Sequence, residues 1–234
     1  MLLLLSFTLS SAIAGERTFA FSYGYGTLPR GGIEVEEYAT VALPSGGLPQ
    51  WEHQVELEYG ISDHLEAGLY LVGEQAGGGA FTYGGYKARL RYRFGAQGVG
   101  PLDVAAYLEY VGAASLDAHA VEAKLIVAKD VDKLVTALNL EYKLKVAGGA
   151  IAHEIEPTVG VGYRAAEWFT LGVEGKGEVE LGDETEVFGW VGPSMHLAGE
   201  GGRVWWTVAA LLPLTEDTRA EDGVVVRSLV ALNL

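Results

Sequence analysis

The chain has 234 residues, of which 49% are hydrophobic, and its 31 acidic and 16 basic side chains give a formal net charge of −15. This charge argues against nucleic acid as a partner, because binding to nucleic acid needs a basic surface that displaces counterions. The chain contains no cysteine, which excludes a disulfide framework and thiolate metal sites.

Residues 1–14, "MLLLLSFTLSSAIA", form an apolar run that ends on small residues. Such a run followed by small residues is typical of a secretory signal peptide, although no basic residues precede it here. The run is shorter than the roughly 18 residues that a membrane-spanning helix needs. We therefore expect a signal peptide over residues 1–14, cleaved near Ala14. No later apolar run is long enough to predict a transmembrane helix.

Residues 15–31 contain Phe19, Phe21, Tyr23 and Tyr25 at alternate positions, followed by the turn-forming sequence "TLPRGG". The alternation is that of a strand, because successive side chains of a strand point to opposite faces. The sequence does not show which element this segment would pair with.

From Gly32 onward, twelve segments alternate in polarity and are separated by Gly, Pro, Asp and Asn, which is typical of strands joined by turns. Each segment is close to the 9–11 residues that a tilted strand needs to cross the hydrocarbon layer of a membrane. The expected strands are 32–43, 51–60, 65–74, 85–95, 102–111, 119–129, 134–146, 151–163, 168–179, 185–197, 203–212 and 223–234.

The two faces of these segments fit either a soluble sandwich or barrel with an apolar interior, or a membrane barrel with an apolar exterior. We favour the membrane barrel, because the lengths are uniform, the strand number is even and aromatic residues lie near the segment ends, where interfacial girdles would fall. These aromatic residues are Trp51, Tyr59, Tyr70, Tyr86, Phe94, Tyr110, Tyr142, Tyr163, Phe169 and Trp206. The predicted fold is therefore all-β, an antiparallel up-and-down transmembrane β-barrel of twelve strands over residues 32–234. Residues 15–31 would lie at its periplasmic mouth or inside its lumen.

The polar face of the predicted barrel separates charges by sign. The first three segments are acidic, whereas the fourth, "GGYKARLRYRFG", carries a cation at every second position, so that all four cations share one face. The residues that we predict to line the pore are Lys87, Arg89, Arg91, Arg93, Glu34, Glu36, Glu52, Glu56, Glu58, Glu66, Glu141, Lys143, Glu154, Glu156, Glu174 and Lys176. A narrow pore with walls of opposite charge would pass small polar or charged solutes by diffusion. The alternative is that these charges pair and close the lumen, which would leave a structural barrel or one that binds an envelope protein.

Two stretches, "YGISDHLEAGLYL" (59–71) and "GYRAAEWFTLGVEG" (162–175), resemble the strand–short turn–strand units of bacterial outer-membrane barrels. The lead-in "ERTFAFSYGYGTLPRGGIEVEEY" (16–38) resembles the mature N-terminus of small barrels grouped with the phenol-degradation MetA-like putative transporters. The resemblance implies a transport function in the outer membrane of a Gram-negative bacterium, with membrane lipid as a partner.

No catalytic residue, metal site or cofactor is predicted. The five histidines are scattered, and none has a second His or Cys at the spacing of a metal site. Ser194 and His196 would share a face, as a nucleophile and its base must. We assign that face to the lumen, however, whereas the active site of a membrane-embedded lipase has to meet lipid.

Overall fold

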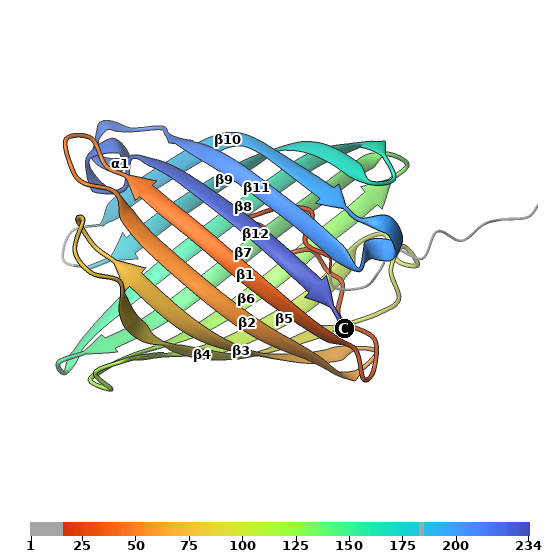
Figure 1. Ribbon diagram of the computed structural model, residues 1–234, viewed down its shortest axis with the longest axis horizontal. Coiled ribbons are helices and arrows are strands. Elements are labelled where there is room, and N and C mark those ends of the chain that lie inside the picture. Colours follow the sequence, from red (N-terminus) through yellow and green to blue (C-terminus); the bar gives the residue numbers. More distant parts are fainter. Residues whose placement is uncertain (1–15, 183–184) are drawn as a thin grey trace, which may run out of the picture.

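In the computed structural model, which describes residues 16–182 and 185–234, twelve antiparallel strands close into a barrel (Figure 1). Each strand pairs with its neighbours in the chain, and β12 returns to pair with β1. The strands are β1 (Ile33–Leu43), β2 (Gln50–Ser62), β3 (Leu65–Gln75), β4 (Thr82–Arg93), β5 (Asp103–Ala113), β6 (Ala118–Val131), β7 (Leu134–Ala147), β8 (Ala150–Ala166), β9 (Phe169–Leu181), β10 (Glu186–Ala198), β11 (Val204–Pro213) and β12 (Val224–Asn233). The predicted fold class and strand number are confirmed, and every predicted strand end lies within three residues of the observed one. The predicted signal peptide lies outside the described residues.

The alternation of polarity orients the wall as predicted. In β3, Leu69 and Leu71 are more than 60% exposed on the outside, whereas Tyr70 between them is 3% exposed and points inward. An exposed apolar exterior around a charged interior is the reverse of a soluble protein and is the arrangement that a hydrocarbon layer requires. No helix among the described residues is long and apolar enough to cross a membrane.

Exposed aromatic side chains lie near both ends of the strands. We call the end where β1 begins and β12 ends the terminal end, and the other the distal end. Aromatic residues near the terminal end are Tyr59, Tyr92, Phe94, Tyr163, Trp168 and Trp206, and those near the distal end are Trp51, Phe81, Tyr83, Tyr110 and Tyr142. Two such belts are typical of the interfaces of a membrane barrel. Tyr70 does not belong to them, contrary to the prediction, because its side chain lies inside.

Short connections join the strands at both ends. At the distal end the longest described connection, between β11 and β12, contains the helix α1 (Glu216–Glu221), whose N-cap Thr215 accepts a hydrogen bond from the backbone of Thr218. At the terminal end the connection between β10 and β11 holds the 3₁₀ turn η1 (Glu200–Gly202).

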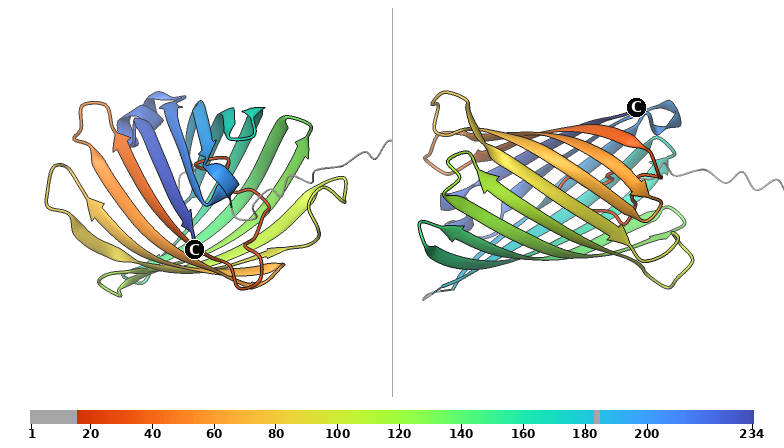
Figure 2. Two further views of the ribbon diagram at one scale, coloured as in Figure 1. Left: turned by 45° about the vertical axis from the view of Figure 1, so that its right-hand side comes forward. Right: turned by 90° about the horizontal axis from the view of Figure 1, so that it is seen from below.

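Residues 16–31 form no strand, and the segment folds into the barrel from the terminal end (Figure 2). Its side chains from Arg17 to Phe21 include four that are less than 8% exposed, and Tyr23, Tyr25, Thr27 and Leu28 are buried as well. The sequence left two positions open for this segment, the periplasmic mouth and the lumen, and in the structure residues 16–31 lie in the lumen. We call residues 16–31 the plug segment.

Candidate functional site

The interior of the barrel holds a buried group of charges on β1–β4. We call it the buried ion cluster; it consists of Glu34, Glu36, Glu56, Glu58, Glu66, Arg89 and Arg91, all at most 2% exposed. The register of the strands places opposite charges side by side. Glu66 on β3, for example, lies directly opposite Arg91 on β4. Opposite charges at such positions stabilise a sheet.

Arg89 is the centre of this cluster. Its guanidinium contacts Glu56 at 2.5 Å and Glu66 at 2.7 Å, and it also pairs with Glu58. The side chain crosses β3 at Gly68, where an added Cβ would lie 2.8 Å from Nε of Arg89. Glycine at this position therefore lets a cation on β4 reach carboxylates on β2.

A second set of charges surrounds a cavity of about 200 Å³ in the middle of the lumen. Lys124 pairs with Glu141 at 2.6 Å, and Lys143 and Lys176 both contact Glu156, at 3.1 and 3.0 Å. The side chains of these three lysines are 9–20% exposed, in contrast to the fully buried side chain of Arg89, because they border the cavity. The charged residues that line this cavity are Glu52, Lys87, Glu109, Glu122, Lys124, Glu141, Lys143, Glu156, Lys176 and Arg227.

A larger cavity of about 390 Å³ lies toward the distal end. Gln50, Trp51 and Gln75, at the distal ends of β2 and β3, line it together with Asp222, which follows α1. The two cavities share Glu52, Lys176 and Arg227 in their walls. The distal half of the lumen is therefore a charged vestibule, and Phe21 of the plug segment contributes to the wall of both cavities.

The plug segment is held to the wall through its backbone. The carboxylate of Glu174 accepts hydrogen bonds from the amides of Ala20, Phe21 and Ser22, at 2.8, 2.7 and 3.1 Å. The side-chain amide of Asn139 accepts from the amide of Tyr23 at 2.6 Å and donates to its carbonyl at 3.0 Å. Buried polar side chains thus take the place of a neighbouring strand and satisfy a segment that joins no sheet.

Side chains of the plug segment also fit recesses in the wall. Phe19 packs over Gly160, where an added Cβ would lie 2.6 Å from its ring, and over Gly172, where the corresponding distance is 3.2 Å. Any larger residue at Gly160 would meet the ring, because real Cβ atoms do not approach this closely.

Arg17 joins the plug segment to the buried ion cluster. Its guanidinium lies 3.8 Å from the ring centre of Tyr23 and donates to the hydroxyl of Tyr38 at 3.0 Å, and Tyr38 also contacts Glu36 and Glu56. Burial lowers the pKa of Arg17, but Tyr23, Tyr38 and Glu36 together raise it well above its ordinary value, so that Arg17 is a cation.

The residues that the sequence predicted to line a pore all lie on the inner face, but in different surroundings. Glu34, Glu36, Glu56, Glu58, Glu66, Arg89 and Arg91 are in the buried ion cluster, Glu174 holds the plug segment, and Arg93 contacts Tyr25 of that segment at 3.2 Å. Glu154 pairs with Lys143 at 2.9 Å. Only Glu52, Lys87, Glu141, Lys143, Glu156 and Lys176 of the predicted set border the central cavity.

Several residues of the site were absent from the predicted set. The alternation of the sequence places Lys124, Glu122 and Arg227 on the polar face, and in the structure they line the central cavity. Arg17 carried no such signal. Asn139 alternates with Glu141 and Lys143 and so belongs to the polar face, but its role depends on the path of a segment that forms no strand. Ser194 and His196 are both 5% exposed inside the barrel, and Nδ1 of His196 lies 2.7 Å from the hydroxyl of Thr207.

Solved structures with the same fold include two porins and an outer membrane channel. The KdgM porin superposes with a TM-score of 0.60 at 11% identity, over 86% of this chain and 99% of that one. The NanC porin gives 0.61 at 9% identity, over 86% and 100%. The COG4313 outer membrane channel from Pseudomonas putida F1 gives 0.61 at 11% identity, over 90% and 98%. At these identities the likeness shows the fold alone.

Comparison of the sequence with known proteins finds one family. No curated protein matches the chain. A family model matches residues 11–220, which covers the plug segment and most of the barrel. The chain belongs to this family, which is described as a family of unknown function, DUF6662.

Proposed function

We propose that the protein is a channel for small polar or charged solutes in the outer membrane of a Gram-negative bacterium. The observation that carries the proposal is the vestibule, in which a central cavity of about 200 Å³ and a distal cavity of about 390 Å³ share lining residues of both signs. Walls of opposite charge attract and orient dipolar solutes. The fold shared with small outer-membrane channels supports the same conclusion, as does the resemblance of residues 16–38 to MetA-like transporters.

In this proposal the plug segment controls passage. It fills the terminal half of the lumen, and a third cavity of about 90 Å³ lies on its other side, lined by Glu16, Phe19 and Tyr25. This cavity shares no lining residue with the two cavities of the vestibule. A solute that enters from the distal end would therefore cross only when the plug segment shifts.

The solute would be small and charged or strongly polar. One solved KdgM porin is described as a complex with disordered oligogalacturonate, an acidic sugar chain. The lysines around the central cavity would attract an anionic solute of this kind, although the carboxylates beside them reduce the attraction.

Conductance of the folded protein in a planar bilayer tests the proposal. We expect brief openings of small conductance in the native chain and longer ones when the plug segment is loosened by Glu174→Ala. Lys143→Glu should shift the ion preference toward cations, because Lys143 borders the central cavity. Barrels that stay insulating in both the native and the Glu174→Ala forms would contradict a channel function.

The second candidate is a closed barrel with a structural or partner-binding role. Its supporting observation is the plug segment itself, which is bound by three hydrogen bonds to Glu174 and two to Asn139. Gentle detergent extraction followed by identification of a stoichiometric envelope protein would favour this role, provided that the Glu174→Ala form is also insulating.

A further inference from the structure

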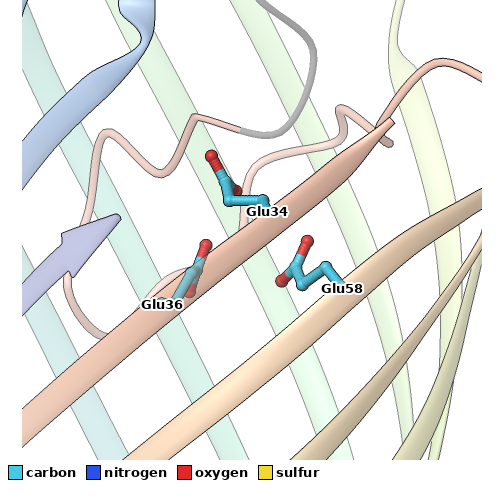
Figure 3. Close-up of side chains that lie close together, drawn as sticks. All are labelled: Glu34, Glu36 and Glu58. Carbon is cyan, nitrogen blue, oxygen red and sulfur yellow. The ribbon is translucent and has the colours of Figure 1, made fainter. Parts of the chain in front are cut away.

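Three carboxylates of the buried ion cluster converge inside the barrel. Glu34 and Glu36 rise from β1 and Glu58 from β2, all toward the same side of the sheet (Figure 3). One oxygen atom from each lies within 4.8 Å of the other two. All three side chains are at most 1% exposed.

Each of the three carboxylates has an oxygen without a donor. Oε1 of Glu34, Oε1 of Glu36 and Oε2 of Glu58 are buried and form no hydrogen bond within the described part of the chain. The remaining oxygen of Glu34 is well bound, since it accepts from Trp205 at 2.9 Å and from Asn233 at 2.6 Å. The carboxylates are thus fixed by one oxygen while the other is left bare, which is costly for a buried charge unless something binds there.

The register of the strands makes this cost larger. Glu34 lies directly opposite Glu58, and Glu36 lies directly opposite Glu56. Like charges at such positions destabilise a sheet. Nη2 of Arg91 approaches the bare oxygen of Glu58 only to 3.9 Å, beyond hydrogen-bond distance.

The charges of the cluster do not balance. It contains five carboxylates, and the guanidinium groups that contact them or their partner Tyr38 are those of Arg17, Arg89 and Arg91. Two negative charges are left over in a space from which water is excluded. One divalent cation, or two protons, would neutralise them.

We propose that Glu34, Glu36 and Glu58 bind one Ca²⁺ ion. Calcium takes carboxylate oxygens at 2.3–2.6 Å in irregular geometry, so oxygens up to about 5 Å apart can share one ion. The observed spacing lies within this limit. Magnesium fits less well, because it requires a regular octahedron at 2.0–2.1 Å and keeps several waters.

The ion would be structural. Because the site is buried, we expect it to be filled as the barrel folds, and it would join β1 and β2 beside the strand pair β1–β12 that closes the barrel. This role does not depend on whether the barrel conducts.

The test uses the full barrel, refolded into detergent from lipopolysaccharide-free inclusion bodies, because lipopolysaccharide binds calcium itself. Metal content is measured by mass spectrometry after dialysis, and the unfolding temperature is measured in Ca²⁺, Mg²⁺ and chelator. Terbium provides a second probe, since Trp205 beside Glu34 should sensitise its luminescence. We expect one Ca²⁺ per chain, an unfolding temperature several degrees higher in Ca²⁺ than in chelator, and terbium luminescence that Ca²⁺ abolishes.

The double variant Glu34→Gln/Glu36→Gln removes both surplus charges. We expect it to bind no calcium and to unfold at the same temperature in Ca²⁺ and in chelator. The matched control is Glu180→Gln, from the second acidic group, Glu154, Glu178 and Glu180, in which Lys143, Lys145 and Lys176 already supply cations. It should keep the calcium response unchanged.

Three results would overturn the proposal. Native protein without bound calcium and with equal unfolding temperatures in Ca²⁺ and chelator would show that two protons balance the cluster. An equal effect of Mg²⁺ would remove the assignment to calcium. Calcium binding that is lost in Glu180→Gln would assign the ion to the second acidic group, Glu154, Glu178 and Glu180. The measurements on the native protein decide the question even if the double variant does not fold.

Discussion

The hydrogen bonds between Glu174 and the plug segment allow a quantitative prediction. Glu174→Ala leaves the amides of Ala20, Phe21 and Ser22 without their acceptor. A hydrogen bond to a charged group contributes about 1.5–3 kcal/mol, but water can enter the space that the side chain leaves and satisfy some of the amides. We therefore take a loss of about 3 kcal/mol from all three bonds, which raises the population of an undocked plug segment about a hundredfold.

The absence of cysteine provides the assay for this prediction. Ser22 is fully buried and its hydroxyl forms no hydrogen bond, so Ser22→Cys adds a single buried thiol at small cost. A water-soluble methanethiosulfonate reagent reaches this thiol only when the plug segment leaves its place. If docking is fast compared with modification, the rate follows the undocked population. We expect modification about a hundredfold faster with Glu174→Ala than with Glu174 intact, and an unchanged rate with the control Glu180→Ala.

Equal modification rates with and without Glu174 would refute this reasoning. They would mean that Asn139 and the packing of Phe19 hold the plug segment by themselves. A faster rate without any gain in conductance would instead separate the two questions: the segment would move, but its movement would not open the lumen.

Three further predictions concern the wall of the barrel. Arg89→Met removes the cation that three buried carboxylates share and should lower the free energy of unfolding by about 3–5 kcal/mol in chelator. Arg164→Ala, at a half-exposed pair with Asp130, should lower it by less than about 1 kcal/mol. Urea unfolding followed by tryptophan fluorescence compares the two variants, and similar losses would contradict the difference in burial between the two pairs. Gly160→Leu should displace Phe19 and speed the modification of Ser22→Cys, and a rate unchanged from that of Ser22→Cys alone would show that the recess does not hold the ring. Lys176→Glu should shift the reversal potential of any conductance toward cations, whereas the exposed Arg30→Glu should leave it unchanged; an equal shift in both would show that surface charge, and not the vestibule, selects the ion.

The structure also changes what is expected of the basic face of β4. The sequence predicted that Arg89 and Arg91 line the wall of a pore. In the structure both side chains are enclosed by carboxylates. Their exchange for Glu should therefore unfold the barrel before it alters selectivity.

Local sequence pattern was enough to predict the wall of the barrel. A strand exposes alternate residues to opposite faces, so a run such as Leu69-Tyr70-Leu71 shows its orientation without any distant contact. Turn residues between the runs set the strand number, and all twelve predicted strands are present in the described residues. Tyr70 is the exception among the predicted interfacial aromatics. Its residue type suggested an interfacial position, but its place in the alternation between Leu69 and Leu71 puts its side chain inside the barrel.

What fills the barrel was decided only by the tertiary structure. Residues 16–31 have the alternation of a strand, yet they bind through their backbone to Glu174 and Asn139, which lie more than a hundred residues away in the sequence. The sequence could likewise place Glu34, Glu36, Glu58 and Arg89 on one face, but not show which charges pair and which oxygens are left bare. Alternation is a local property of each strand, whereas pairing across a closed lumen depends on register, on gaps such as Gly68 and on the path of a segment outside the sheet.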